Sequence, residues 1–220
     1  ELKRESTRKA LELYEPMKRV IEAADDSLLT AIRIAIAGNV IDAGPSGTFD
    51  IYATLEDVLT KEFAICDYEA FQDHLGGCRK ILYIGDNAGE TVFDRLLIEQ
   101  MNKPTVFVVR EMPVINDATY EDAVAAGLDK VATIVSSGTD APGAVIRTCS
   151  PEFTEMMEEA DFIIAKGQGN YEALSGYHRR IFCLLKVKCR IIADAIGVAE
   201  GDIVLEELNV STESRVKAIS

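Results

Sequence analysis

The sequence predicts an α/β fold with a mostly parallel sheet that is covered by helices on both faces. Two observations carry this prediction. Short, nearly continuous apolar runs are typical of parallel strands buried on both faces, and here they alternate with amphipathic helical patterns. The apolar runs lie at 81–84, 105–109, 131–135, 162–165, 181–187 and 203–205. The helical patterns lie near 89–101, 118–126, 151–159, 170–177 and 189–197.

The first 75 residues have a helical pattern. Apolar residues recur at helical spacing on either side of Asp25-Asp26-Ser27, a natural helix cap. Gly44-Pro45-Ser46-Gly47 marks a break. A further amphipathic stretch runs from about Leu55 to Leu75 and ends at Gly76-Gly77. We therefore expect this part of the chain to be helical.

These patterns divide the chain into three parts. We expect a helical cap at 1–76, an α/β core at 77–208 and a polar, loosely ordered tail at 209–220. The first residue is Glu1 rather than methionine, so we expect the cap to be incomplete at its N-terminus.

Composition and charge narrow the function classes. A chain of 220 residues with 48% hydrophobic and 27% charged residues is ordinary for a soluble globular protein. The net charge of −14 argues against nucleic acid and against an anionic membrane surface as partners. No apolar stretch reaches the roughly 18 residues that span a bilayer, and no leader begins the chain, so we expect a cytoplasmic location. The five cysteines form no Cys-x-x-Cys pair, which argues against zinc and disulfides.

The loop after the apolar run at 81–84 reads Gly85-Asp86-Asn87-Ala88-Gly89-Glu90. Asp86 or Asn87 can serve as a helix cap, but one cap needs only one such residue. The flanking glycines allow the backbone to approach a ligand, and the following helix directs its positive end at an anion. We therefore favour a ligand site. Glu90 is favourable in a first helical turn on dipole grounds alone; a role as a base, or as a residue that supports metal ligands, is an equal alternative. For Asp94, one turn further on, we favour a structural role.

A second strand end carries a similar group. Asn116 and Asp117 follow the apolar run at 105–109 and either cap the next helix or bind a ligand. In a parallel sheet the two loops lie side by side at the carboxyl edge. Asp86, Asn87 and Asp117 offer only hard oxygen donors, which suit Mg²⁺ or Mn²⁺. Arg110 precedes this loop and either binds phosphate or forms a surface ion pair; the sequence favours neither.

Two further loops are candidates for anion binding. The loop at 136–143 holds Ser137 and Gly138, which can cradle an anion or form a plain turn. The loop at 166–170 runs from Lys166 to Asn170 and is expected to contact substrate. Lys166 is placed to neutralise a phosphate as a point charge, and the alternative is a solvated surface lysine.

In the helical part, Asn39 and Asp42 are three residues apart and share one helix face. They either line a cleft between cap and core and contact substrate, or act in capping and hydrogen bonding. Other chemistries are excluded. The phosphate-binding pattern Gly-x-x-x-x-Gly-Lys-Ser/Thr is absent, Glu172 stands where a dinucleotide fingerprint needs its third glycine, and no Asp-x-Asp follows the first strand.

Five motifs in order resemble the metal-dependent damage-control phosphatases, also called domain of unknown function 89, and are similar to their compact archaeal and bacterial branch. The resemblance implies that Asp86, Asn87 and Asp117 hold a divalent metal, and that the core is a three-layer α/β/α sandwich after a helical N-terminal part. It also implies removal of phosphate from small phosphorylated metabolites, sugar phosphates among them. Members of this branch often begin with a segment carrying Cys-x-x-Cys, which this chain lacks. The motifs lie at 37–42, 85–90, 113–119, 137–143 and 166–172.

The leading hypothesis is therefore a phosphomonoesterase that uses Mn²⁺, Ni²⁺, Co²⁺ or Mg²⁺, with Asp86, Glu90 and Lys166 in the chemistry. Whether a phospho-aspartyl intermediate forms stays open, as does the oligomeric state. Two alternatives remain. The stretch from Tyr83 to Gly89 loosely resembles an adenosylmethionine loop of methyltransferases, although its second carboxylate, Glu111, is weakly placed. A non-catalytic metabolite-binding module is the other.

Overall fold

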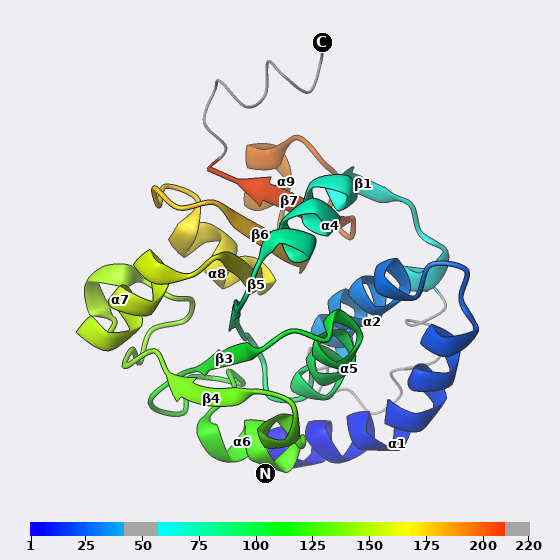
Figure 1. Cartoon of the computed structure of the whole chain (residues 1–220), viewed down its shortest axis with the longest axis horizontal. Helices are drawn as coiled ribbons and strands as arrows, with labels where there is room; N and C mark the ends of the chain where they lie inside the picture. The colour runs from blue at the N-terminus through cyan, green and yellow to red at the C-terminus, as the bar shows by residue number, and fades with distance from the viewer. Residues whose placement is uncertain (42–56, 210–220) are drawn as a thin grey trace.

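A computed structural model of the chain describes residues 1–41 and 57–209 (Figure 1). Asp42, the predicted break at 44–47 and most of the predicted tail lie outside these residues, as does the side chain of Asn39.

The described residues form a seven-stranded sheet with the strand order β1-β7-β6-β5-β2-β3-β4. Every neighbouring pair is parallel except β6 and β7, which are antiparallel. This confirms the predicted mostly parallel sheet. The strands are β1 Phe63–Cys66, β2 Ile81–Ile84, β3 Thr105–Val109, β4 Thr133–Ser136, β5 Phe162–Lys166, β6 Ile181–Lys186 and β7 Ile203–Leu208.

Helices cover both faces of this sheet and give three layers, as expected (Figure 1). Successive side chains of a strand point to opposite faces, so Tyr83 joins one hydrophobic cluster and Ile84 the other. One face carries α1 Leu2–Ala23, α2 Ser27–Ile41, α4 Tyr68–Gly77, α5 Thr91–Met101 and α6 Tyr120–Ala125. The other carries α7 Pro151–Glu159, α8 Gly167–Leu174 and α9 Arg190–Ile196. Two short 3₁₀ turns are η1 Leu128–Lys130 and η2 Ile146–Thr148.

The first two helices pack directly on the core. Helix α1 is amphipathic and buries residues such as Leu13, Met17 and Ile21 along one face. Helix α2 is apolar over most of its surface, with Arg33 as its one charged residue, and every residue from Ile34 to Ala37 is fully buried. Such a helix is stable only when neighbours cover it all round, and α1 and α5 pack against it. No helix among the described residues is long and apolar enough to cross a membrane.

The prediction of one helical stretch from Leu55 to Leu75 is wrong in its middle. Residues 63–66 form the edge strand β1, which pairs in parallel with β7, and α4 begins only at Tyr68. Burial alternates along β1 with the two-residue period of a strand, a short pattern that the flanking helical spacing hides. The predicted boundary between a helical cap and an α/β core at residue 76 stays a prediction. Residues of β1 and α4, which precede this boundary, pack in the same hydrophobic cluster as the sheet.

A substitution at Phe71 of α4 tests whether the segment before residue 77 unfolds together with the α/β core. Its ring is fully buried and lies edge-on to Phe162 at 5.1 Å and Phe182 at 5.4 Å between ring centroids. Phe71→Ala should lower the free energy of unfolding by about 3–5 kcal/mol, because it leaves a cavity among aromatic rings, and unfolding should remain one cooperative transition. Denaturant unfolding measures this, with Ile191→Ala at a 79% exposed side chain as the control. A loss below about 1 kcal/mol, or a separate transition for the N-terminal part, would contradict it.

Candidate functional site

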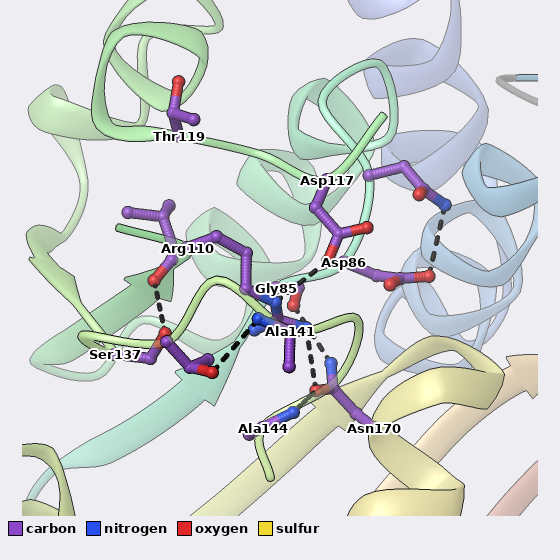
Figure 2. A network of polar contacts seen from close by, with 12 residues as sticks. Gly85, Asp86, Arg110, Asp117, Thr119, Ser137, Ala141, Ala144 and Asn170 are labelled. Atoms are coloured by element: carbon purple, nitrogen blue, oxygen red, sulfur yellow. Dashed lines mark hydrogen bonds and ion pairs between the residues drawn. The ribbon is translucent and has the colours of Figure 1, made fainter. Parts of the chain in front are cut away.

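The candidate site lies at the carboxyl ends of β2, β3 and β5, which are neighbours in the sheet. Ligands of open α/β folds bind at this edge. Asp86 follows β2, Arg110 follows β3, and Lys166 ends β5. Figure 2 shows Asp86, Asp117, Arg110 and Asn170 gathered at this edge.

The two predicted acid–amide pairs lie side by side. Asn87 and Asp117 form an isolated antiparallel bridge, in which the Ala118 amide donates to the Asp86 carbonyl at 2.8 Å. The Asn87 side chain donates from Nδ2 to Asp86 Oδ2 at 3.1 Å. Asn87 and Asp117 are almost fully buried, whereas Asp86 is half-buried and is the most accessible of the three. The short antiparallel pairing therefore assembles two carboxylates and one amide.

Arg110 forms a buried ion pair, so the predicted surface ion pair is wrong about exposure, and the phosphate-binding role of Arg110 stays a prediction. Its Nε donates to Asp117 Oδ2 at 2.9 Å, and both side chains are almost inaccessible. Burial raises the pKa of Asp117, and the guanidinium offsets this rise only in part. The Asp117 carboxylate thus lies where additional positive charge would stabilise it.

Asn170 lies fully buried at the start of α8 with all its hydrogen-bonding capacity in use. Its Oδ1 accepts from Arg110 Nη2 at 3.0 Å and from the Ala144 amide at 2.8 Å. Its Nδ2 donates to the carbonyls of Gly85 at 3.0 Å and Lys166 at 2.7 Å. The expected substrate contact is therefore not open to Asn170 as it is placed.

Lys166 is fully buried, so the alternative of a solvated lysine is wrong. Its Nζ donates to the Ala35 carbonyl and Glu90 Oε2, each at 2.8 Å, and to Asp94 Oδ1 at 2.5 Å. Burial alone would lower the pKa of this amine, but the attraction of Asp94 and Glu90 is stronger and the pKa is raised. An ammonium group has three protons, and all are donated within the protein. The expected contact with phosphate is not made from this position.

Glu90 connects this buried lysine to the candidate ligands. Its Oε2 accepts from Lys166, and its Oε1 accepts from the Asn87 backbone amide at 2.7 Å. Glu90 thus positions the backbone of Asn87. Of the two roles predicted for Glu90, the one of supporting metal ligands fits these contacts better than that of a base.

The sequence does not indicate how Tyr83 and Asp94 take part. The Tyr83 hydroxyl donates to Asp94 Oδ1 at 2.7 Å inside the core, beside Lys166. Burial raises the pKa of Asp94 to about 6, although Lys166 acts to lower it. The spacing of Glu90 and Asp94 by one helical turn is the only signal of this cluster in the sequence. The structural role predicted for Asp94 matches these contacts.

Close packing brings two more segments to the site. Gly167 has φ +78°, and an added Cβ there would lie 2.0 Å from Asp86 Oδ2, so only glycine lets β5 end beside Asp86. At Gly38 an added Cβ would lie 3.0 Å from the Glu90 Cβ. The C-terminal end of α2 therefore lies against the site, and the predicted substrate role of Asn39 stays a prediction.

The loop after β4 is built as a tight turn. The buried Ser137 hydroxyl donates to the Val109 carbonyl at 3.0 Å. Gly138 has φ +71°, and an added Cβ would lie 2.7 Å from the Ser150 Cβ. These contacts match the plain-turn alternative, and the anion-binding role of Ser137 and Gly138 stays a prediction.

The residues at this edge fit a hard divalent cation. No cluster of three or more His, Cys, Asp or Glu side chains suited to a metal occurs among the described residues. The predicted ligand set of Asp86, Asn87 and Asp117 contains only two residues of these four types, because its third member is an asparagine. Its donors are all oxygen, as Mg²⁺ and Mn²⁺ prefer, and one is a buried carboxylate with a raised pKa.

Asp94 offers a direct test of the buried charge cluster. A raised pKa in the folded state means that the folded protein holds this proton more tightly than the unfolded chain does. The stabilising effect is therefore fully present below pH about 4 and is lost as pH rises through about 6. Asp94→Asn removes this titration. The unfolding free energy of the variant, relative to wild type, should rise between these pH values and then level off. Denaturant unfolding across this pH range, with chelator present, measures the difference, and a constant difference would contradict the account.

Comparison with known proteins identifies the family. Residues 1–204 match the damage-control phosphatase ARMT1-like domain. An uncharacterised protein of Methanocaldococcus jannaschii is 40% identical over 216 residues, covering 93% of this chain and 71% of that protein. A damage-control phosphatase of Pyrococcus horikoshii is 41% identical over 180 residues, covering 79% of this chain and 63% of that relative. A damage-control phosphatase of Archaeoglobus fulgidus is 36% identical over 213 residues, covering 93% of this chain and 73% of that relative.

Among solved structures, the crystal structure of a DUF89 family protein from Pyrococcus horikoshii superposes with a TM-score of 0.80 at 36% identity. The match covers 92% of this chain and 74% of that one. Sequence and fold therefore agree with the resemblance carried by the five motifs. The chain belongs to the family of damage-control phosphatase ARMT1-like domains.

Proposed function

We propose that this protein is a metal-dependent phosphatase that hydrolyses phosphate monoesters of small phosphorylated metabolites. The observation that carries the proposal is the pairing of Asp86 and Asn87 with Asp117 at the carboxyl edge of the sheet. Two relatives that share 36% and 41% identity with this chain bear the name damage-control phosphatase. The methyltransferase alternative receives no support from these relatives.

The balance of charge around the site supports a divalent cation. Four carboxylates, those of Asp86, Glu90, Asp94 and Asp117, gather there with two buried cations, Lys166 and Arg110. Lys3 also reaches the Asp117 carbonyl, but its charge is paired with Asp122. In formal charge the group is therefore two units negative. A buried site rich in carboxylate oxygens favours a hard cation, and one divalent ion would balance the formal charge of these six side chains.

Asp86, Asn87 and Asp117 would hold this ion, which we propose to be Mn²⁺, Ni²⁺, Co²⁺ or Mg²⁺. When bound it would stabilise the negative charge that develops on the transferring phosphoryl group.

The protein's own residues divide the remaining tasks. Asp86 is the accessible carboxylate and lies closest to solvent, where a phosphate ester can reach it. Arg110 fixes the orientation of the Asp117 carboxylate, and Glu90 fixes the Asn87 backbone. Helix α5 begins directly after this loop, so its positive dipole end lies near the bound anion. Lys166 contributes through Glu90 rather than by touching substrate. The end of α2 that carries Asn39 is placed to influence which metabolite is preferred.

The first test concerns metal and turnover together. Purified protein should bind one Mn²⁺ and hydrolyse a simple phosphate monoester. Hydrolysis should stop with chelator and return with Mn²⁺, Co²⁺, Ni²⁺ or Mg²⁺. Asp86→Asn and Asp117→Asn should each reduce turnover by roughly two orders of magnitude or more and weaken Mn²⁺ binding, because each removes an anionic oxygen donor. Calorimetry and steady-state kinetics measure the two effects.

Asp129→Asn, an exposed carboxylate in η1, is the matched control and should leave both properties at the wild-type level. Full metal binding in both site variants would remove these residues from the metal site. Hydrolysis that ignores chelator would contradict metal dependence, and methyl transfer from adenosylmethionine would favour a different enzyme class.

A further inference from the structure

We propose that Asn170 is a positioning residue that sets the distance and orientation between Asp86 and Asp117. This inference rests on the proposed function, because it concerns the geometry of the same metal site. Asn170 is fully buried and touches neither solvent nor the three proposed ligands. Its contribution therefore has to pass through the groups that it holds.

The four hydrogen bonds of Asn170 reach four different segments of the site. Its two donor bonds end on the Gly85 carbonyl at the end of β2 and on the Lys166 carbonyl at the end of β5. Its two acceptor bonds come from Arg110 after β3 and from the Ala144 amide in the loop after β4. One carboxamide thus links the ends of β2, β3 and β5 with the loop that follows β4.

Two of these bonds lead directly to the proposed ligands. Gly85 is the residue before Asp86, so the bond to its carbonyl fixes where the backbone places Asp86. Arg110 holds Asn170 with Nη2 and Asp117 with Nε, so the direction of its guanidinium depends on both partners. Both carboxylates are therefore placed relative to the same amide (Figure 2).

The strand ladder alone does not provide this link. The registered pairing of β2 with β5 ends at Ile84 and Ala165, and that of β2 with β3 ends at Ile84 and Val108. The Gly85 amide continues the pairing with β3 by donating to the Val108 carbonyl at 3.0 Å, whereas the registered pairs with β5 stop at Ala165. The Asn170 side chain supplies the hydrogen bonds that a further ladder step would have made between Gly85 and β5. A carboxamide is suited to this position because it offers two donors and two acceptor sites in one plane.

Partner residues that orient metal ligands typically change metal affinity by 10- to 100-fold when removed. Asn170→Ser and Asn170→Leu remove most or all of the four bonds without adding charge. We expect Asn170→Ser to weaken Mn²⁺ binding by roughly ten-fold or more. We also expect it to change the visible absorption spectrum at saturating Co²⁺, because that spectrum reports ligand geometry. Turnover should fall more than KM rises.

Asn209→Ala is the matched control. Its side chain donates to the carbonyls of Leu174, at the other end of α8, and of Arg179, at 3.2 and 2.9 Å. The variant loses two part-buried hydrogen bonds, one of them to the same helix, without touching the site, so it should lose stability while its Mn²⁺ affinity and Co²⁺ spectrum stay at wild-type values. If Asn170→Leu does not fold, Asn170→Ser, which keeps a hydroxyl, carries the test.

The outcomes separate the two proposals. Wild-type protein that binds neither Mn²⁺ nor Co²⁺ would overturn the proposed metal site, and this inference with it. Wild-type binding with an Asn170→Ser variant of equal Mn²⁺ affinity and an unchanged Co²⁺ spectrum would overturn the positioning role alone. Reduced affinity in Asn170→Ser but not in Asn209→Ala would support it.

Discussion

The architecture of this site depends on keeping charged groups buried at the carboxyl edge of the sheet. Isolated buried charges are expensive, so each is held by partners of opposite charge or by hydrogen bonds. Lys166 lies between Glu90 and Asp94, and Arg110 lies against Asp117. Breaking such a pair leaves an uncompensated charge and is more costly than never having formed it. The pairs of Lys166 therefore fix the end of β5 against the start of α5, and the Arg110–Asp117 pair fixes the end of β3 against the loop that follows it.

The N-terminal helices complete this arrangement. Helix α2 supplies the Ala35 carbonyl that accepts the third proton of Lys166, and its end at Gly38 packs against Glu90. The residues of this helix from Ile34 to Ala37 are fully buried beside Lys166, so they exclude water from the lysine cluster. Low local polarity strengthens each of these electrostatic contacts. The N-terminal helices thus pack against the buried charged residues beneath the site as well as against the sheet.

Much of the fold and the centre of the site follow from sequence patterns, because strand ends can be located from apolar runs. Asp86, Asn87 and Asp117 were placed in this way, and the sheet brings them together. Side-chain direction and burial are harder to predict. Lys166 ends β5 and Asn170 lies in the following helix α8, both near the edge where substrates bind. Both side chains nevertheless turn inward, because their partners Glu90, Asp94 and Arg110 come from other segments. Tyr83 was hidden inside an apolar run. The strand β1 was missed because its four residues interrupt a longer amphipathic pattern.

We expect one divalent ion to bind between Asp86, Asn87 and Asp117 and to balance the negative charge of the site. Diffraction from crystals grown with Mn²⁺, with data collected near the manganese absorption edge, tests it most directly. We expect one anomalous difference peak at the carboxyl edge of β2 and β3, about 2.0–2.6 Å from oxygens of all three side chains. An empty edge in crystals that otherwise diffract well, or a peak coordinated by other residues, would contradict it.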